Sequence, residues 1–235
     1  MLPILALDTC LGAVSAALLW RDAQGVDRSL GAWELCRGGH AERLIPMVQT
    51  LLADAAVEAR EVGCIAVTLG PGTFTGVRTG IAAARAFALS CGAAVVGVSS
   101  LHAMAVGLAQ QPVVPPEAAD IAIIVDARKG QVFAQLFDAA GGPRTEPALL
   151  TMGEAAALLV GGRWRIGGSS AATIASAAQT QGATVVSLHA SLEPDATTLL
   201  RLARSLAPLA SVMPIYLRAP DALPPSGKGL ARVAS

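Results

Sequence analysis

The sequence predicts an α/β protein made of two similar units in tandem. Short apolar runs alternate with segments of helical periodicity along the 235 residues, a pattern typical of sheets flanked by helices. An apolar strand, an Asp, a Gly-containing turn and a second apolar strand also occur twice, in 4–15 and 121–133. The matching positions are Asp8, Gly12 and Val14 in the first copy and Asp126, Gly130 and Val132 in the second.

Three matching positions are compatible with coincidence, because hairpins often contain Asp and Gly. The order of the predicted strands is also shared, and this favours duplication of one unit. We expect the first unit to span residues 1–104 and the second, smaller unit residues 105–215.

The first unit should contain strands, helices and one glycine-rich loop in a regular order. We expect strands over 3–8, 13–20, 28–36, 64–69 and 94–98, and helices over 40–56 and after the loop 70–80. In that loop, Pro71 and the flanking glycines stop the preceding strand. Thr73 or Thr75 is expected to cap the helix that follows.

Two helical stripes of this unit are candidates for binding a partner protein. Glycine inside a helix costs about 1 kcal/mol relative to alanine, so a stripe of small residues indicates close approach of a partner helix, a ligand or the chain's own sheet. The predicted partner-binding residues are Leu44, Val48 and Leu51 on the first helix and Gly76, Gly80, Ala84 and Ala88 on the second. On the partner hypothesis, Gly80→Leu should abolish pairing and leave the fold largely intact.

The second unit follows a proline-rich loop at Pro112, Pro115 and Pro116. We expect helices over 152–160 and 169–179 and strands over 164–167 and 184–188. A last helix should start at Asp195 and return to the first unit. Residues 216–235, rich in Pro, Gly and Ser from Asp221 onward, are expected to be a disordered tail.

Composition argues against several classes of protein. No apolar window is long enough to span a membrane, the N-terminus is unlike a signal peptide, and the four scattered cysteines are typical of buried thiols in the cytoplasm. The net charge is zero and aromatic residues make up 3%. Because RNA-binding proteins usually carry a basic excess, we expect any RNA that this protein meets to be held mainly by something else.

The duplicated hairpin suggests phosphate chemistry, because turn amides bind anions and a carboxylate can hold Mg²⁺. A vestigial phosphate site would use the residues Asp8, Thr9, Gly72, Thr73 and Asp126. Purely structural roles are at least as compatible with the same positions. The loop lacks the lysine of a Walker A motif, the histidines lack metal-ligand spacing, and no nucleophile–base pair is recognisable. We therefore predict neither catalytic nor metal-binding residues.

Several segments together resemble the TsaB family, of actin-like (ribonuclease H-like) fold. They are Ile4–Thr9, Glu34–Cys36, His40–Pro46, Gly70–Arg78, Asp126–Arg128 and Pro214–Arg218. The resemblance implies two tandem actin-like lobes, each with a mixed sheet flanked by helices. It also implies a non-catalytic scaffold in the synthesis of N6-threonylcarbamoyladenosine at position 37 of tRNAs that read ANN codons.

The resemblance further implies partners and an absence of tightly bound cofactors. TsaB-like chains pair with the transferase TsaD, and the ATPase TsaE joins them; the isolated chain would form a homodimer and meet tRNA only through the complex. Weak binding of nucleotide or Mg²⁺ at the TsaB–TsaD–TsaE interface is compatible with this. The loop 167–170 lacks the Asn of nucleotide-binding relatives. The alternative is a stand-alone Mg-ATP-dependent kinase or ATPase of the same superfamily.

Overall fold

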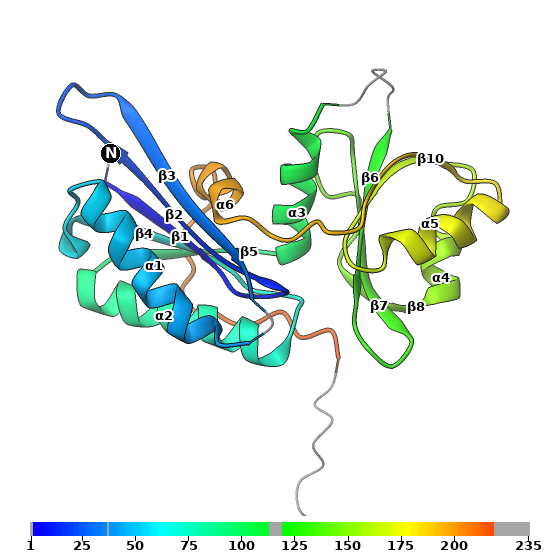
Figure 1. Cartoon of the computed structure of the whole chain (residues 1–235), viewed down its shortest axis with the longest axis horizontal. Helices are drawn as coiled ribbons and strands as arrows, with labels where there is room; N and C mark the ends of the chain where they lie inside the picture. The colour runs from blue at the N-terminus through cyan, green and yellow to red at the C-terminus, as the bar shows by residue number, and fades with distance from the viewer. Residues whose placement is uncertain (1, 37, 113–118, 219–235) are drawn as a thin grey trace, which may run out of the picture.

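The chain forms two α/β lobes that lie side by side (Figure 1). The computed structural model describes residues 2–36, 38–112 and 119–218. Most of the predicted tail and the prolines Pro115 and Pro116 lie outside these ranges. Within them, no helix is both long and apolar enough to cross a lipid bilayer. All four cysteines are free, with Cys10 and Cys36 buried.

The first lobe is built on a five-stranded mixed sheet in the order β3-β2-β1-β4-β5. Strands β1, β2 and β3 are an antiparallel meander, and β4 and β5 extend it in parallel from β1. The strands are β1 (Ile4–Asp8), β2 (Ala13–Arg21), β3 (Asp27–Leu35), β4 (Cys64–Thr68) and β5 (Ala94–Val98). All five predicted strands of this lobe are therefore confirmed.

Helices cover both faces of this sheet. On one face lie α1 (His40–Asp54) and α2 (Phe74–Cys91), and the short 3₁₀ helix η1 (Ala59–Glu61) leads into β4. The other face is covered by α6 (Ala196–Ala203), the last helix of the described chain. The Asp195 carboxylate accepts a hydrogen bond from the Thr197 amide at 2.8 Å, so the predicted cap and the predicted return of this helix are both confirmed.

The second lobe repeats the first in sheet order and connectivity. Its sheet runs β10-β9-β6-β7-β8, which is the order of the first sheet listed from the other edge. The strands are β6 (Asp120–Asp126), β7 (Gln131–Phe137), β8 (Ala148–Thr151), β9 (Arg163–Gly167) and β10 (Thr184–His189), with helices α4 (Met152–Ala157) and α5 (Ala171–Thr180). This correspondence favours the duplication inferred from the hairpin pattern, and the fold is actin-like as predicted.

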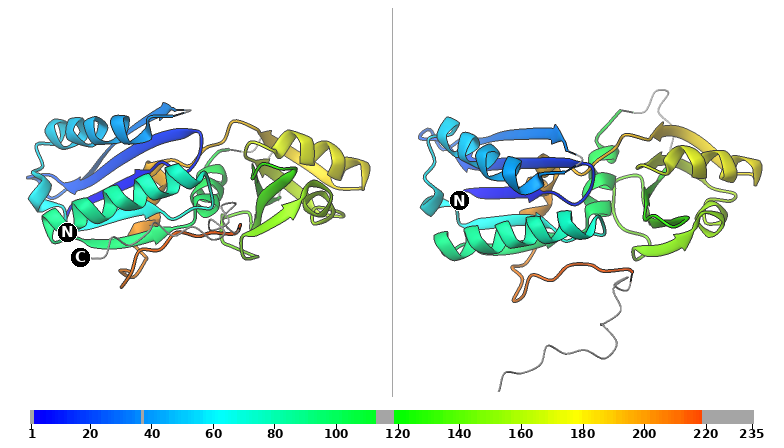
Figure 2. Two further views of the ribbon diagram at one scale, coloured as in Figure 1. Left: turned by 90° about the horizontal axis from the view of Figure 1, so that it is seen from below. Right: turned by 60° about the horizontal axis from the view of Figure 1, so that its bottom comes forward.

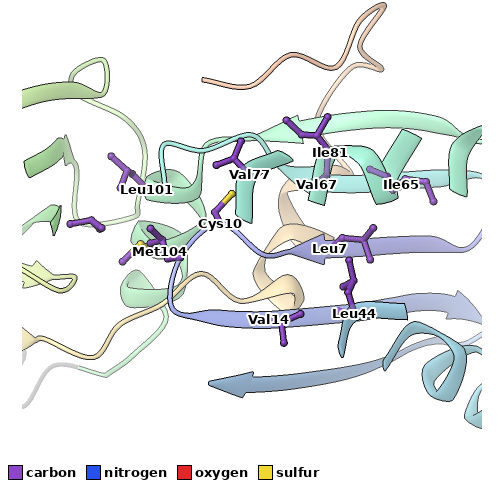
Figure 3. Close-up of a cluster of buried hydrophobic side chains, with 14 of the residues drawn as sticks. Leu7, Cys10, Val14, Leu44, Ile65, Val67, Val77, Ile81, Leu101 and Met104 are labelled. Atoms are coloured by element: carbon purple, nitrogen blue, oxygen red, sulfur yellow. The ribbon is translucent and has the colours of Figure 1, made fainter. Parts of the chain in front are cut away.

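The two lobes exchange their last helices. Helix α3 (Ser100–Ala109), which follows β5, packs against β6, β7 and β9 of the second lobe. Helix α6, which follows β10, packs on the first sheet. The predicted boundary at residue 104 falls inside α3. One continuous buried cluster accordingly joins residues of the first sheet, such as Leu7 and Val67, to Leu101 and Met104 of α3 (Figure 3).

A strap formed by residues 206–218 runs back from α6 along the first lobe and lies below α2 in Figure 2. Its backbone is tied at two points, where the Leu209 amide donates to the Val95 carbonyl at 2.8 Å and the Ile215 amide to the Leu69 carbonyl at 2.7 Å. Val212 is buried against the lobe. The strap therefore follows an ordered course as far as Arg218.

Candidate interlobe site

The glycine-rich loop and the start of α2 close over the turn between β1 and β2. The Thr73 amide donates to the Cys10 carbonyl at 2.8 Å. The Thr73 hydroxyl accepts from the Gly76 amide at 3.1 Å, which makes Thr73 the helix cap as predicted. The Thr9 hydroxyl donates to the Gly76 carbonyl at 2.6 Å. The chain's own turn thus packs directly against this helix start.

The glycines are required by this close contact. A Cβ at Gly72 would lie 2.3 Å from the Cys10 carbonyl oxygen, and one at Gly76 would lie 2.1 Å from the Thr9 carbonyl oxygen. At Gly80 it would lie 2.7 Å from the Thr9 hydroxyl. The stripe therefore faces the chain's own turn and sheet, the alternative that the sequence left open.

The other predicted partner-binding residues also face the interior of their own lobe. Leu44, Val48, Leu51 and Ala84 belong to the core, with between 0% and 5% of their surface exposed. Ala88 is half-buried against that core. As placed, these side chains are covered by their own lobe and do not form its outer surface. Because a Cβ at Gly80 would lie 2.7 Å from the Thr9 hydroxyl oxygen, we now expect Gly80→Leu to destabilise the fold instead of sparing it.

Asp8 lies beneath the turn and is fully buried. Its Oδ1 accepts hydrogen bonds from the Thr68 hydroxyl at 2.5 Å and the Cys10 amide at 3.3 Å. Among the described residues, no group forms a hydrogen bond with its Oδ2. Burial raises the pKa of this carboxyl from 3.8 to about 7, against the opposing effect of the Thr68 hydrogen bond.

A cleft of about 700 Å³ opens between the lobes, and Asp8 does not line it. Three carboxylates do line it, those of Glu42, Asp126 and Glu193, together with Arg128 and His40. The hydroxyl side chains along it are those of Thr73, Thr75, Thr79 and Ser169. Among the residues that the structure describes, a nucleotide phosphate in this cleft would face more carboxylates than cations.

Glu193 was not anticipated from the sequence, although it holds the key contact of the cleft. Its Oε2 accepts a hydrogen bond from the Gly12 amide at 2.9 Å. Gly12 is the glycine of the first duplicated turn, whose amide would otherwise be free to bind an anion. Burial raises the pKa of Glu193. The chain therefore supplies its own carboxylate at the first turn.

The second duplicated turn is also engaged internally. The Asp126 amide donates to the Ser169 hydroxyl at 2.9 Å, and the Asp126 carboxylate accepts from the Arg128 amide at 2.9 Å. Asp126 is exposed to the cleft, whereas Asp8 is not. Of the five residues predicted for a vestigial phosphate site, Thr73 and Asp126 line the cleft; Asp8, Thr9 and Gly72 do not.

The Asp8 carboxylate is not placed to hold a Mg²⁺ bound to a nucleotide in the cleft, because it does not line the cleft. Within the described ranges, no three His, Cys, Asp or Glu side chains come together as a metal site. One oxygen of Asp8 accepts hydrogen bonds from neighbouring donors, and the side chain is surrounded by core residues. We therefore derive no chemical step that runs through a bound metal or nucleotide.

Comparison with known proteins places the chain in a family. A family model described as TsaD, tRNA N6-adenosine threonylcarbamoyltransferase, matches residues 34–163. YeaZ from Pseudomonas aeruginosa, a solved structure, superposes with a TM-score of 0.77 at 31% identity, over 92% of this chain and 100% of that one. The chain belongs to the TsaB family, to which YeaZ also belongs. It shares the domain that the TsaD model describes.

Curated relatives carry the same family name. The protein named tRNA threonylcarbamoyladenosine biosynthesis protein TsaB from Escherichia coli is 37% identical over 131 residues, 55% of this chain and 52% of that protein. The Bacillus subtilis protein of the same name is 33% identical over 135 residues, 57% of this chain and 54% of that protein. The matches thus span about half the length of these relatives.

Proposed function

We propose that this TsaB-family chain is a non-catalytic scaffold subunit in the synthesis of N6-threonylcarbamoyladenosine at position 37 of tRNAs that read ANN codons. It would bind and support TsaD, help to recruit the ATPase TsaE, and work in the cytoplasm, where tRNA is modified. The observation that carries the non-catalytic part is the internal occupation of the first turn by Glu193. Two further observations support a non-catalytic role. Asp8 is buried and does not line the cleft, and the cleft is lined by carboxylates.

The surface proposed to bind TsaD is the outer face of α1 and α2, revised from the buried stripes. On α2 the exposed residues Ala82, Ala86 and Leu89 are spaced by four and three, so they share one face of the helix. Leu89 is 87% exposed, and Ile45 on α1 is 40% exposed. We call these four residues the outer stripe. An exposed apolar face of this kind is typical of a protein-binding surface, and small side chains allow close helix approach.

A charge placed on this outer stripe tests the proposal. Ala86→Glu should weaken copurification of TsaD by at least about tenfold, because it would bury an unpaired carboxylate at the interface. Ala172→Glu, on an exposed position of α5 in the other lobe, is the matched control and should leave copurification unchanged. Equal retention of TsaD by both variants would contradict this interface. The same variant should shift the isolated chain from dimer to monomer, because a two-fold dimer would use one face twice.

The kinase or ATPase alternative makes an opposite prediction for the isolated chain. It requires Mg-ATP binding, which we expect to be absent in calorimetry at millimolar nucleotide. It also requires that Asp8→Asn abolish activity. On our proposal this variant retains support of TsaD in a reconstituted tRNA-modification assay. Nucleotide turnover by the chain alone would decide for the alternative.

A further inference from the structure

The strap and the start of α2 bring two exposed aromatic rings onto one arginine. Phe74 and Tyr216 are 55% and 48% exposed, with ring centroids 6.1 Å apart and planes 23° from parallel. The Arg78 guanidinium lies 3.5 Å from the Phe74 ring centroid, and its Nε donates to the Tyr216 hydroxyl at 2.9 Å. These rings are half-exposed although large aromatic side chains gain most from burial.

Two further arginines continue this cluster along the strap. Arg85 is seven residues after Arg78, about 10.5 Å further along the same side of α2, and donates to the Val212 carbonyl of the strap. Arg218 donates to the Gln131 side-chain oxygen at 2.6 Å and to the Arg128 carbonyl at 3.2 Å, across the lobe boundary. We call Phe74, Arg78, Arg85, Tyr216 and Arg218 the strap patch.

In the part of the chain that the structure describes, no carboxylate pairs with the arginines of the strap patch. Within the described ranges, its three arginines bond to a phenol, carbonyls and an amide, all neutral. Exposed arginines elsewhere, such as Arg21, Arg60 and Arg144, pair with carboxylates. The sequence explains this local excess, because no Asp or Glu occurs in 62–112 or in 196–218. A chain of zero net charge therefore carries one basic strip.

We propose that the strap patch binds single-stranded RNA, with arginines on phosphates and a base stacked on the exposed rings. Guanidinium groups suit phosphates, and exposed aromatic rings accept any base by stacking. An acidic peptide would use the charges but would gain little from two open rings. The patch adjoins the outer stripe on α2, because Arg85 lies three residues after Ala82 and four before Leu89. RNA bound there would lie next to a partner protein docked on the outer stripe.

This inference rests on the proposed role in tRNA modification and refines it, because the chain would contribute contacts to RNA held mainly elsewhere. The test is fluorescence anisotropy of the full chain with a labelled twelve-nucleotide oligouridine and an unmodified tRNA transcript that reads ANN codons. At low salt we expect dissociation constants on the order of 10⁻⁵ M, weakening as salt rises. Arg78→Gln with Arg85→Gln should reduce affinity about tenfold or more. It should also lower the slope of log K against log salt by about 1.4, since each single-strand phosphate contact contributes about 0.7.

Two controls separate RNA binding from general charge and from folding. Arg60→Gln removes one positive charge, against two in the double variant, from a carboxylate-paired site and should leave affinity nearly unchanged. Tyr216→Ala should weaken oligouridine binding by about 5- to 150-fold, the range expected for loss of one stacked base. Tyr216→Phe, which keeps the ring, should weaken it much less. Unchanged thermal melting of each variant verifies the fold.

Three results would overturn the inference. The first is the absence of salt-dependent binding of either RNA at 100 µM wild-type chain. The second is an equal loss of RNA affinity in Arg60→Gln and in the double variant. The third is a Tyr216→Ala protein that binds oligouridine with normal affinity, while polyglutamate competes with the labelled RNA as well as unlabelled RNA does. TsaD copurification with the same variants distinguishes the two proposals. Retained TsaD pairing with unchanged RNA binding in the double variant overturns the strap patch alone, whereas retained TsaD pairing in Ala86→Glu overturns the proposed TsaD interface alone.

Discussion

At the scale of single residues, Asp8 illustrates how burial can change the role of a carboxylate. In a phosphate-binding hairpin an aspartate at a strand end would face the ligand. Here it faces Thr68 and Cys10 inside the core, and one of its oxygens has no partner. Since its pKa is raised to about 7, the folded chain holds a proton that the unfolded chain releases near pH 4. The contribution of Asp8 to the stability of the fold is therefore more favourable at low pH than at high pH.

The raised pKa of Asp8 makes the stability of the fold depend on pH. Between the unfolded pKa of 3.8 and the folded pKa of about 7, the native state binds more protons, so stability falls as pH rises. For Asp8 the loss between pH 5 and pH 8 is on the order of 2–3 kcal/mol. Asp8→Asn should remove this part of the slope. Urea unfolding of both proteins at the two pH values measures it, and parallel pH profiles would contradict the assigned environment.

Gly80 gives a second prediction at this scale, because its hydrogen atom faces the Thr9 hydroxyl where a Cβ would lie 2.7 Å away. Gly80→Leu should lower the free energy of unfolding by about 3 kcal/mol or more through overpacking. Ala86→Leu, on the exposed face of the same helix, should change it by less than about 0.5 kcal/mol. Denaturant titration compares the pair. If the Gly80→Leu protein were as stable as the Ala86→Leu protein, the inward placement of the small stripe would be contradicted.

At the scale of elements, the exchange of α3 and α6 ties each lobe to the other. The first sheet buries one face under α6, and Leu199 and Leu200 of that helix lie in a cluster with Ile4, Ala66 and Val96. The residues that complete the first lobe therefore come almost 100 positions after its last strand. Neither lobe has a complete core made only from its own contiguous segment.

Truncating one buried leucine of α6 should accordingly destabilise the first lobe. Leu199 has none of its surface exposed, and Leu199→Ala should cost about 2–5 kcal/mol by lost burial and a residual cavity. Leu206→Ala, at a position that is 38% exposed, should cost much less. Hydrogen exchange of β1 and β4 amides would locate the effect. Faster exchange confined to the second lobe would be incompatible with the exchanged helices.

The sequence predicted most elements because their periodicities were clear, and the exceptions have physical reasons. Helix α3, in the segment Ser100–Ala109, is apolar on nearly all sides, so it shows no amphipathic period. Strand β8 has only four residues. The stripe on α2 was found, but a four-residue spacing does not say which side faces inward. That choice is made by Thr9 and Cys10, which contact the glycines from another strand.

The candidate site was less predictable because its contacts are long-range. Glu193 meets Gly12 across 181 positions, and no local pattern marks a loop carboxylate as a partner for a distant amide. The strap patch likewise joins α2 to residues more than 130 positions later. Net charge concealed it as well, because acidic residues elsewhere in the chain balance the local excess of arginine.

At the scale of the whole molecule, Glu193 connects the lobes and divides the space between them. It follows the last strand of the second lobe, bonds to the first turn of the first lobe, and lines both the 700 Å³ cleft and a second cavity of about 440 Å³ beside Trp33 and Met104. Removing this side chain would leave a partly buried amide without its acceptor and enlarge both cavities. The relative position of the lobes should depend on it.

Two substitutions at this residue separate its hydrogen bond from its charge. Glu193→Ala leaves the Gly12 amide without an acceptor, and it should lower stability by about 1–3 kcal/mol and speed exchange of that amide at least about tenfold. Glu193→Gln keeps an acceptor oxygen and removes the charge, so both quantities should stay near those of the natural chain. Amide exchange by NMR reports Gly12 directly, and small-angle scattering reports the lobe arrangement. If Glu193→Ala leaves the Gly12 amide as protected as before, the exchanged helices and the strap hold the lobes without this contact.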